Sequence, residues 1–584
     1  MCSSPVSLDL LPEHGGGTGP AASEKAVRPA VDRRARGKRF WRQGEPMVWA
    51  TGAALAAVLF FTIVLLGVVV VNAAAVFWPE AVGLVTFEDG SRVLGVRLDS
   101  AVNPDTGVRT VRFKTGNREL DPARLDFHWY EADQIREIAY PEDVFVLERL
   151  ENGNFYGFLE AVRAPNLDLP ETGDSGEGFR WALAAARAKQ AARIVPLTDQ
   201  LSSLSDRLQS VRHAVLRAEY EKKRVLAGAP AGATARLDAR LADLAEQEHE
   251  LKAQSDALVV EQQGQEAELG QNAAVFRTGS GATVEIPLVE IVRHYRPNAM
   301  GFGQKVAHYF SKVGELLTEN PRESNTEGGL FPAIFGTVML VFLMAVSCFP
   351  LGVLAGIYLG EYAKEGPLVR TVRIAVNNLA GIPSIVYGIF GLGFFVYGIG
   401  GLIDLWFFPE RTANNMPTFG TGGILWASLT LGLLTVPVVI VSTEEALRTI
   451  PRGLREGSYA LGATRFQTLV RVLLPMASPG MMTGFILAMA RAAGEVAPLM
   501  ITGVVKLAPD LPVDGAFPYF HPDRKFMHLG FHIYDIGFQS PNVEASKPMV
   551  YVTTMLLLVI VLSMSSLAIW LRSRMRRQFH SRTI

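Results

Sequence analysis

Charged residues are scarce in this sequence of 584 residues, where Asp, Glu, Lys and Arg make up 19% of positions. A soluble globular domain carries about 25%. The deficit is concentrated in six stretches that contain none of the four, namely 46–79, 331–360, 374–403, 412–443, 472–490 and 548–571. A bilayer-spanning helix needs about 20 mostly apolar residues. These stretches therefore exclude a soluble enzyme and a disordered chain, and they predict an all-α polytopic membrane protein with six spanning helices.

Cysteine is almost absent as well. The two cysteines, Cys2 and Cys348, lie in a polar tail and inside a charge-free stretch, which excludes a disulfide scaffold. We expect Cys348 to be a buried structural thiol and predict no metal site. The sequence has no Gly-x-x-x-x-Gly-Lys-Ser/Thr phosphate loop, so it is not expected to bind ATP in that way. We predict no cofactor and no catalytic residue, and the net charge of −1 gives no support for a nucleic-acid partner.

The placement of basic residues predicts the orientation of the spans. Eight Lys and Arg residues precede the first stretch, five arginines follow the last, and five lie within 444–471, whereas 401–420 holds only Arg411. Both termini and the loop 444–475 are therefore expected in the cytoplasm, with the region 79–329 outside. The predicted domains are a basic tail 1–46, a first spanning helix 47–78, an insert 79–329, a core 330–572 with five further spans, and a tail 573–584.

The first span has one rival interpretation. Asn72-Ala-Ala-Ala resembles a small-residue cleavage site, so the segment could be a cleaved signal peptide. Its leader is long, its apolar run is about twice a typical signal core, and cleavage would remove the basic anchor. We therefore favour an uncleaved helix.

The insert 79–329 has an ordinary soluble composition and is predicted to be α+β. Hairpins are expected to turn at Asp89-Gly90, at Asn152-Gly153 and around 279–281. Leucines and valines alternate spacings of three and four within 201–215 and 237–258, the seam of a coiled coil, and 228–232 separates the two runs. We predict an antiparallel helical hairpin over about 178–270, which serves either as a spacer or as a docking site for a partner.

A short amphipathic helix is expected just before the second span. Its apolar face is formed by Val306, Tyr309, Phe310, Val313, Leu316 and Leu317. Lys312 and Glu315 are predicted to point away from this face. The helix either lies at the membrane surface or packs against the insert.

The predicted cytoplasmic loop contains the most informative motif. It reads Glu456-Gly-Ser-Tyr-Ala-Leu-Gly462, then nine residues, then Val472-Leu-Leu-Pro475. This resembles the "EAA" loop of bacterial ABC importer permeases, with Gly457 and Ser458 in place of two alanines and with Leu474 in register. Gly462 permits a turn between two short helices. An apolar knob at Ala460, Leu461 and Phe466, with charges at Arg455, Glu456 and Arg465, could dock a soluble motor protein.

Four further segments narrow the resemblance. They lie at 328–337, 356–363, 381–391 and 490–499, and the last reads Ala490-Arg-Ala-Ala-Gly-Glu-Val-Ala-Pro-Leu499. Together they resemble the PstA-type permease of the phosphate-specific transport system over residues 326–575, but not over the insert. The resemblance implies a multi-pass subunit of the bacterial cytoplasmic (inner) membrane that carries phosphate. It also implies a second permease of the PstC type, ATPase subunits of the PstB type and a periplasmic phosphate-binding protein of the PstS type. ATP hydrolysis would occur on the partner.

Two charged residues in the fifth span are candidates for the translocation pathway. Arg491 and Glu495 are four residues apart, so they are expected on one helical face near mid-membrane. A fixed cation suits an anionic substrate, and the alternative is an ion pair that only locks the bundle. Asn377 and Asn378 are predicted to make interhelical hydrogen bonds in the third span. Pro383, with Gly381 and Gly388, should kink that span and allow close packing.

Two other functions remain open. A permease of the same fold could carry another oxyanion, because the docking loop does not select the substrate. The chain could instead be a membrane-anchored sensor or scaffold that acts through its extracytoplasmic coiled coil, although such a protein has no need of an ATPase-docking loop.

Overall fold

The structure is a computed structural model that describes residues 45–102, 107–120, 126–167, 175–226, 234–322, 325–515, 517–540 and 543–580. The chain divides into two compact units, residues 1–67 and 68–584. Cys2, the basic tail up to residue 44, the helix-separating turn 228–232 and Arg582 lie outside the described residues.

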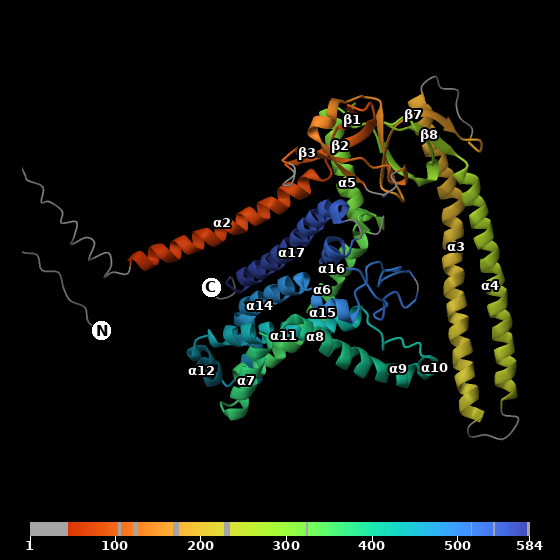
Figure 1. Cartoon of the computed structure of the whole chain (residues 1–584). Helices are drawn as coiled ribbons and strands as arrows, with labels where there is room; N and C mark the ends of the chain where they lie inside the picture. The colour runs from red at the N-terminus through yellow and green to blue at the C-terminus, as the bar shows by residue number, and fades with distance from the viewer. Residues whose placement is uncertain are drawn as a thin grey trace, which may run out of the picture. The chain divides into compact units, whose positions relative to one another are not determined.

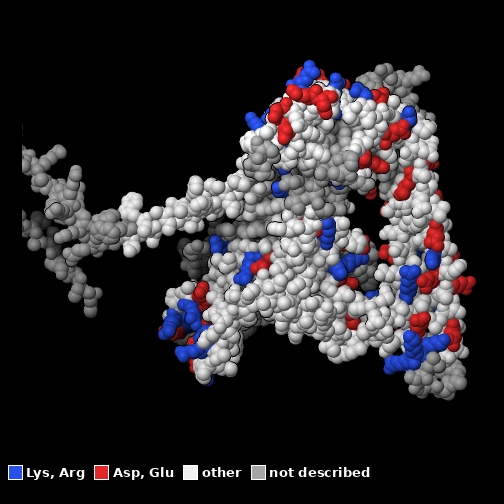
Figure 2. Space-filling view, viewed as in Figure 1, with Lys and Arg blue, Asp and Glu red and all other residues white. Residues whose placement is uncertain are grey.

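Within the described ranges, six helices are long and apolar enough to cross a membrane, as predicted. They are Met47–Ala75, Phe331–Tyr362, Ser384–Phe407, Ile424–Arg448, Arg465–Gly494 and Ser546–Arg574. In Figure 2 the charged side chains gather over the sheets, along two long helices and around the docking loop, while the surface over the spanning helices is mostly uncharged. The first unit contributes most of α2 (Glu45–Ala75), whose side chains from Met47 to Gly67 are exposed. α2 continues through Asn72 as one helix, and its cleavage is untested.

The fourth span, α11 (Ile424–Arg448), forms the centre of the membrane core together with α6 (Phe331–Ile357). The two helices approach closely at Gly356, where an added Cβ would lie 2.6 Å from the Cβ of Thr443. Cys348 lies in this contact and is 2% exposed, which confirms the buried thiol. The Thr435 hydroxyl donates to its Sγ at 3.1 Å. α6 and α11 are therefore closely packed along this contact.

The third span is shorter than the charge-free stretch predicted. A separate helix, α7 (Pro367–Leu379), ends before it, and Pro383 caps α8 (Ser384–Phe390), which continues through a π-helical segment into α9 (Gly401–Phe407). Asn377 and Asn378 therefore lie in α7 with exposed side chains, and the prediction of interhelical hydrogen bonds inside the span is wrong. The break arises because proline lacks an amide donor and disfavours helix in the residue before it.

The insert contains two antiparallel sheets of five strands each, ordered β4-β3-β2-β1-β5 and β10-β6-β7-β8-β9, and a two-stranded ribbon (Figure 1). The strands of the first sheet are β1 Val82–Phe87, β2 Arg92–Val102, β3 Arg109–Lys114, β4 Phe127–Glu131 and β5 Ile135–Ala139. Those of the second are β6 Val144–Arg149, β7 Asn154–Arg163, β8 Ala273–Arg277, β9 Thr283–Pro287 and β10 Ile291–Tyr295, and the ribbon is β11 Pro321–Arg322 with β12 Glu327–Gly328. β1–β2, β6–β7 and β8–β9 pair as the three predicted hairpins. Asn152 and Gly153 both have φ of 65°, the conformation that a tight hairpin turn requires.

Two long helices, α3 (Ser175–Leu226) and α4 (Ala235–Gly270), lie side by side (Figure 1). Ion pairs join them, including one of 2.9 Å between Arg212 Nε and Glu248 Oε1. Whether the pair is a regular coiled coil stays a prediction. The first turns of α3 pack into the second sheet through Phe179 and Leu183, both fully buried. The helical pair is therefore not separable from the sheets at residue 178.

A shortened deletion of these helices should be tolerated where the longer one is not. Removing 200–260 with a short Gly/Ser bridge keeps the sheet core but takes away the contact of Arg217 with Glu410, so the thermal unfolding temperature of the purified chain should fall only slightly. Removing 178–270 takes out Phe179 and Leu183, and each such large-to-small loss costs about 3–5 kcal/mol. Equal unfolding temperatures for the two deletions would show that the root of α3 is dispensable.

α5 (Phe302–Thr318) is the predicted amphipathic helix before the second span. Leu316 is buried, whereas Phe310 on the same predicted face is 68% exposed. Lys312 and Glu315, predicted to point away from the apolar face, are largely buried rather than solvated, since their side chains are 14% and 2% exposed. The structure thus favours packing against the insert, because the polar side of α5 faces the sheets.

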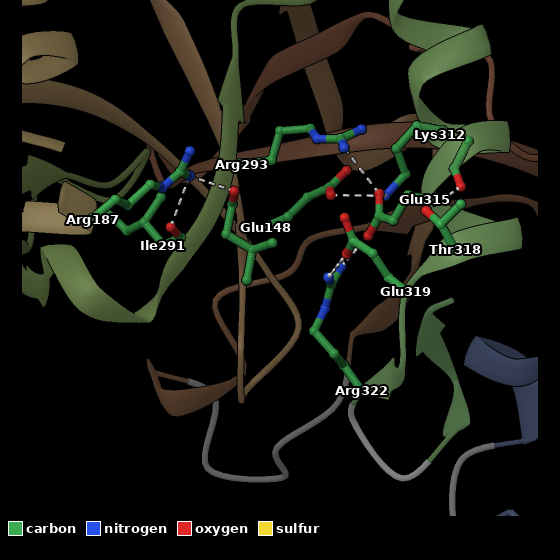
Figure 3. A network of polar contacts seen from close by, with 11 residues as sticks. Glu148, Arg187, Ile291, Arg293, Lys312, Glu315, Thr318, Glu319 and Arg322 are labelled. Carbon is green, nitrogen blue, oxygen red and sulfur yellow. Dashed lines mark hydrogen bonds and ion pairs between the residues drawn. The ribbon is translucent and has the colours of Figure 1, made fainter. Parts of the chain in front are cut away.

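A buried ion network joins α5 to the sheets and to the ribbon before α6 (Figure 3). Lys312 Nζ lies 2.8 Å from Glu148 Oε2 and 2.7 Å from Glu315 Oε2. Arg293 and Arg322 contact the same Glu315 carboxylate at 3.2 Å and 2.5 Å. Burial alone raises the pKa of Glu315, but Lys312, Arg322 and Arg293 outweigh it and hold that pKa below its usual value.

Neutralising Glu315 should destabilise the insert. Glu315→Gln leaves three cations around a neutral amide, and removing one partner of a buried pair costs about 3–5 kcal/mol. Because the folded pKa is lowered, the stabilisation is present above the ordinary glutamate pKa and is lost as the pH falls through the lowered value. Thermal unfolding across pH should therefore show the largest difference from wild type near neutrality. Glu319→Gln is the control, since Glu319 is 49% exposed in its pair; an equal loss in both variants would contradict the account.

Candidate functional site

The predicted docking loop forms two short helices joined by a tight turn. α12 (Arg452–Ala460) is followed by Gly462, whose φ of +84° suits glycine, and then by α13 (Arg465–Thr468). The Ser458 and Thr468 hydroxyls lie 2.9 Å apart and tie the two helices together. The turn at Gly462 that the sequence predicts is thus present.

The tip of this loop exposes an apolar knob. Leu461 is 90% exposed and Phe466 is 67% exposed, although both are large and apolar. Glu456 is also exposed, and the structure gives it no hydrogen bond or ion pair with any residue it describes. Exposed apolar surface beside an unpaired charge is typical of a protein-binding surface.

The sequence predicts Arg455 as a charged contact for a partner, but in the structure its side chain is engaged within the chain. Its guanidinium lies 2.5 Å from Glu361 Oε1 and donates to the carbonyls of Leu447 and Ile450. These contacts anchor α12 to the cytoplasm-facing ends expected for the second and fourth spans. Arg455 therefore holds the loop in place.

The second half of the motif fixes the loop to the membrane core. Leu474 and Pro475 begin α14 (Leu474–Gly494), and Leu474 packs on a cluster that contains Ile357 and Leu447. A Cβ added at Gly457 would meet no atom within 4 Å, so the departure from the family's alanine leaves the packing unchanged. The start of α14 therefore packs in one cluster with residues of the second and fourth spans.

Arg491 and Glu495 lie at the other end of α14. Arg491 Nε is 3.5 Å from Glu495 Oε1, with side chains 32% and 20% exposed. The prediction that both residues share one helical face is wrong. α14 ends at Gly494, and Glu495 is extended, with φ of −81° and ψ of 136°. The chain re-enters a helix at α15 (Ala497–Thr502). The ion pair therefore sits at a break in the helix.

Tyr387 is a site residue that the sequence reasoning missed. It is 4% exposed, its hydroxyl donates to the Leu379 carbonyl at 2.8 Å, and Arg491 acts on it electrostatically. α8 reaches this position because Gly388 lets it approach Pro498 closely. A Cβ added at Gly388 would lie only 2.8 Å from the Cα of Pro498. The sequence signal that could have pointed to Tyr387 is the adjacent Gly388, in the segment 381–391.

The docking loop and the ion pair are joined by a single helix. From Leu474 to Arg491 the helix rises roughly 25 Å at 1.5 Å per residue. One continuous helix, α14, thus carries both the end of the loop and Arg491. Together with the six candidate spans, the arrangement fits a class of protein, the membrane-spanning subunit of a transport system.

Comparison with known proteins agrees with this class. Residues 352–577 match the family described as "Binding-protein-dependent transport system inner membrane component". The chain belongs to the PstA-type permeases of this family. The match begins after the insert, so nothing in it accounts for residues 79–329.

Three relatives illustrate the similarity. The chain is 36% identical over 207 residues to the probable ABC transporter permease protein YqgH of Bacillus subtilis (35% of this chain, 62% of that protein). It is 38% identical over 175 residues to the phosphate transport system permease protein PstA of Mycobacterium leprae (30% and 51%). It is 33% identical over 242 residues to the probable phosphate transport system permease protein PstA of Methanocaldococcus jannaschii (41% and 74%). The chain thus spans between about half and three quarters of these relatives.

Proposed function

We propose that this chain is a membrane subunit of an ATP-driven importer of inorganic phosphate. The observation that carries the proposal is Arg491, a partly exposed cation at a helix break inside the family-matched range. Charges within spanning segments are costly and face a protein interior or an aqueous path. Relatives named as phosphate permeases support phosphate as the anion.

The ATPase partner, of the PstB type, docks on the knob formed by Leu461 and Phe466. Closure of the ATPase pushes on α12 and α13, and the push passes along α14 to Arg491. Hydrolysis occurs on the partner, so this chain is not an enzyme. Alternating access opens the path first to the outside and then to the cytoplasm.

Arg491 and Glu495 have opposite tasks in this proposal. The Arg491 guanidinium binds a phosphate oxygen through charge-assisted hydrogen bonds. Glu495, 3.5 Å away, competes for the guanidinium and keeps phosphate from binding too tightly to leave.

The remaining parts of the proposal are the partners and the orientation. A second permease of the PstC type completes the path, and a periplasmic protein of the PstS type delivers phosphate. Both termini lie in the cytoplasm, and the insert 79–329 lies outside the bacterial cytoplasmic membrane. The basic tails and the basic loop 444–475 support this orientation.

Purification of the chain with its associated subunits tests the proposal. An ATPase should co-purify, and phosphate with the binding protein should stimulate its hydrolysis in liposomes. Stimulation by sulfate or molybdate alone would replace phosphate with another oxyanion. A purified chain without any ATPase would favour the sensor or scaffold.

A further inference from the structure

A cavity of about 720 Å³ lies where the first sheet of the insert meets two span ends, within the unit 68–584. Its lining includes Trp78, just after α2, and Tyr551, near the start of α17 (Val543–His580). Lys114 of β3 and Tyr156 of β7 line it from the insert. Trp and Tyr at span ends are typical of the level of lipid headgroups. The cavity therefore reaches the edge of the membrane region.

Most cations that line this cavity are already paired. The pairs are Arg112 with Asp99, Arg118 with Asp126, Lys312 with Glu148 and Glu315, and Arg322 with Glu315 and Glu319. Lys547 and Glu327 are likewise engaged. These pairs neutralise most of the lining.

Lys114 is different. The structure gives its ammonium no hydrogen bond, and no carboxylate of the described residues lies within 4.0 Å of that ammonium. Burial alone lowers the pKa of Lys114, but Tyr156 and three carboxyl groups, led by Glu327, outweigh it and raise that pKa. The side chain is therefore a protonated ammonium that faces the cavity without a direct partner.

Lys114 is half-buried. A half-buried ammonium without a direct partner is less well solvated than one in water, and a ligand can offset that cost. The ammonium has three donors and no acceptor, so its ligand must supply acceptors, and a negative charge strengthens the bonds. The carboxylates of Asp126 and Glu148 are held by Arg118 and Lys312, and Glu80, which also lines the cavity, makes no ion pair within 4.0 Å with Lys114. A phosphate group supplies both the oxygens and the charge.

We propose that this cavity binds a phosphate group against Lys114, carried either by a phospholipid headgroup or by free inorganic phosphate. Val68 and Val71 of α2 are 49% and 69% exposed and could accompany the acyl chains of a lipid. A lipid would fix the insert at the membrane surface. Free phosphate would make the insert a second phosphate site, separate from Arg491. The inference does not depend on what the spans transport.

Two binding measurements on the full-length chain test the proposal. In the lipid arm, the chain is purified from nanodiscs of phosphatidylethanolamine and phosphatidylglycerol, and retained lipids are counted by native mass spectrometry. In the phosphate arm, delipidated chain is equilibrated with radiolabelled phosphate by dialysis, with Arg491→Ala in the background to remove binding at the ion pair. Each arm compares Lys114→Gln with wild type, with Lys114→Arg and with Lys252→Gln, whose side chain is exposed on α4.

Lys114→Gln should lower retention in one arm by at least about tenfold, the effect of losing one charge-assisted hydrogen bond. Lys114→Arg and Lys252→Gln should retain the ligand. Loss in the lipid arm identifies a headgroup, and loss in the phosphate arm identifies the free anion. Equal retention by Lys114→Gln and wild type in both arms would overturn the proposal. If Lys114→Gln does not fold, the unfolding temperature of the wild-type chain is measured with and without each ligand instead. If neither the lipid nor phosphate raises that temperature, the proposal is overturned as well.

Discussion

Replacing Arg491 with alanine should reduce phosphate uptake by about tenfold to a hundredfold, because a charge-assisted hydrogen bond of about 1.5–3 kcal/mol is lost. Glu495 then remains at the helix break and repels the anion. Arg491→Lys keeps the charge without the planar fork and should retain partial activity. Uptake is measured as radiolabelled phosphate entering proteoliposomes that contain the complete complex.

The double change Arg491→Ala with Glu495→Ala separates a path from a structural lock. If the pair only locks the helix break, removing both partners leaves no unpaired charge and should restore most transport. If Arg491 binds phosphate, the double variant should assemble normally and stay impaired. Near-normal uptake by an assembled double variant would falsify the pathway.

Gly462→Val should uncouple the permease from its ATPase. The φ of +84° is strained for a β-branched residue, and the cost is of order 1–3 kcal/mol. The turn that presents Leu461 and Phe466 would be distorted, so co-purification of the ATPase and phosphate uptake should fall together. Insertion into the membrane should be unchanged, because the turn is exposed.

Gly453→Val is the matched control for this substitution. Gly453 lies in the same loop, in α12, and an added Cβ meets no atom within 4 Å. Its φ is not positive, so the same change tests valine in the loop without strain at the turn. The docking assignment fails if the two variants bind the ATPase equally well.

The spans and the turn in the loop 444–475 could be predicted because their signals are local. A charge-free run reports a span by itself, and Gly462 reports a turn through its own backbone freedom. The hairpins at Asp89-Gly90 and Asn152-Gly153 were predictable for the same reason, since each turn type requires particular residues. The family was predictable because its motifs combine fixed spacing with a fixed place between spans.

The errors concern features set by distant contacts. Spacing alone placed Glu495 on the face of Arg491, but the helix ends at Gly494 and α15 packs separately against α8. Heptad spacing could not show that Phe179 belongs to the core of a sheet. The spacing of apolar residues could not show that Glu315 is buried, because its partner Arg293 lies far away in the sequence.

The central claim is that phosphate crosses the membrane through a path that this chain helps to form. The most direct test is radiolabelled phosphate uptake by proteoliposomes that hold the purified complex, with ATP on the side of the ATPase and the binding protein on the other. We expect accumulation that requires ATP, is competed by unlabelled phosphate but not by sulfate, and is lost with Arg491→Ala. Uptake that proceeds unchanged with Arg491→Ala in an assembled complex, or that sulfate competes equally, would contradict the account.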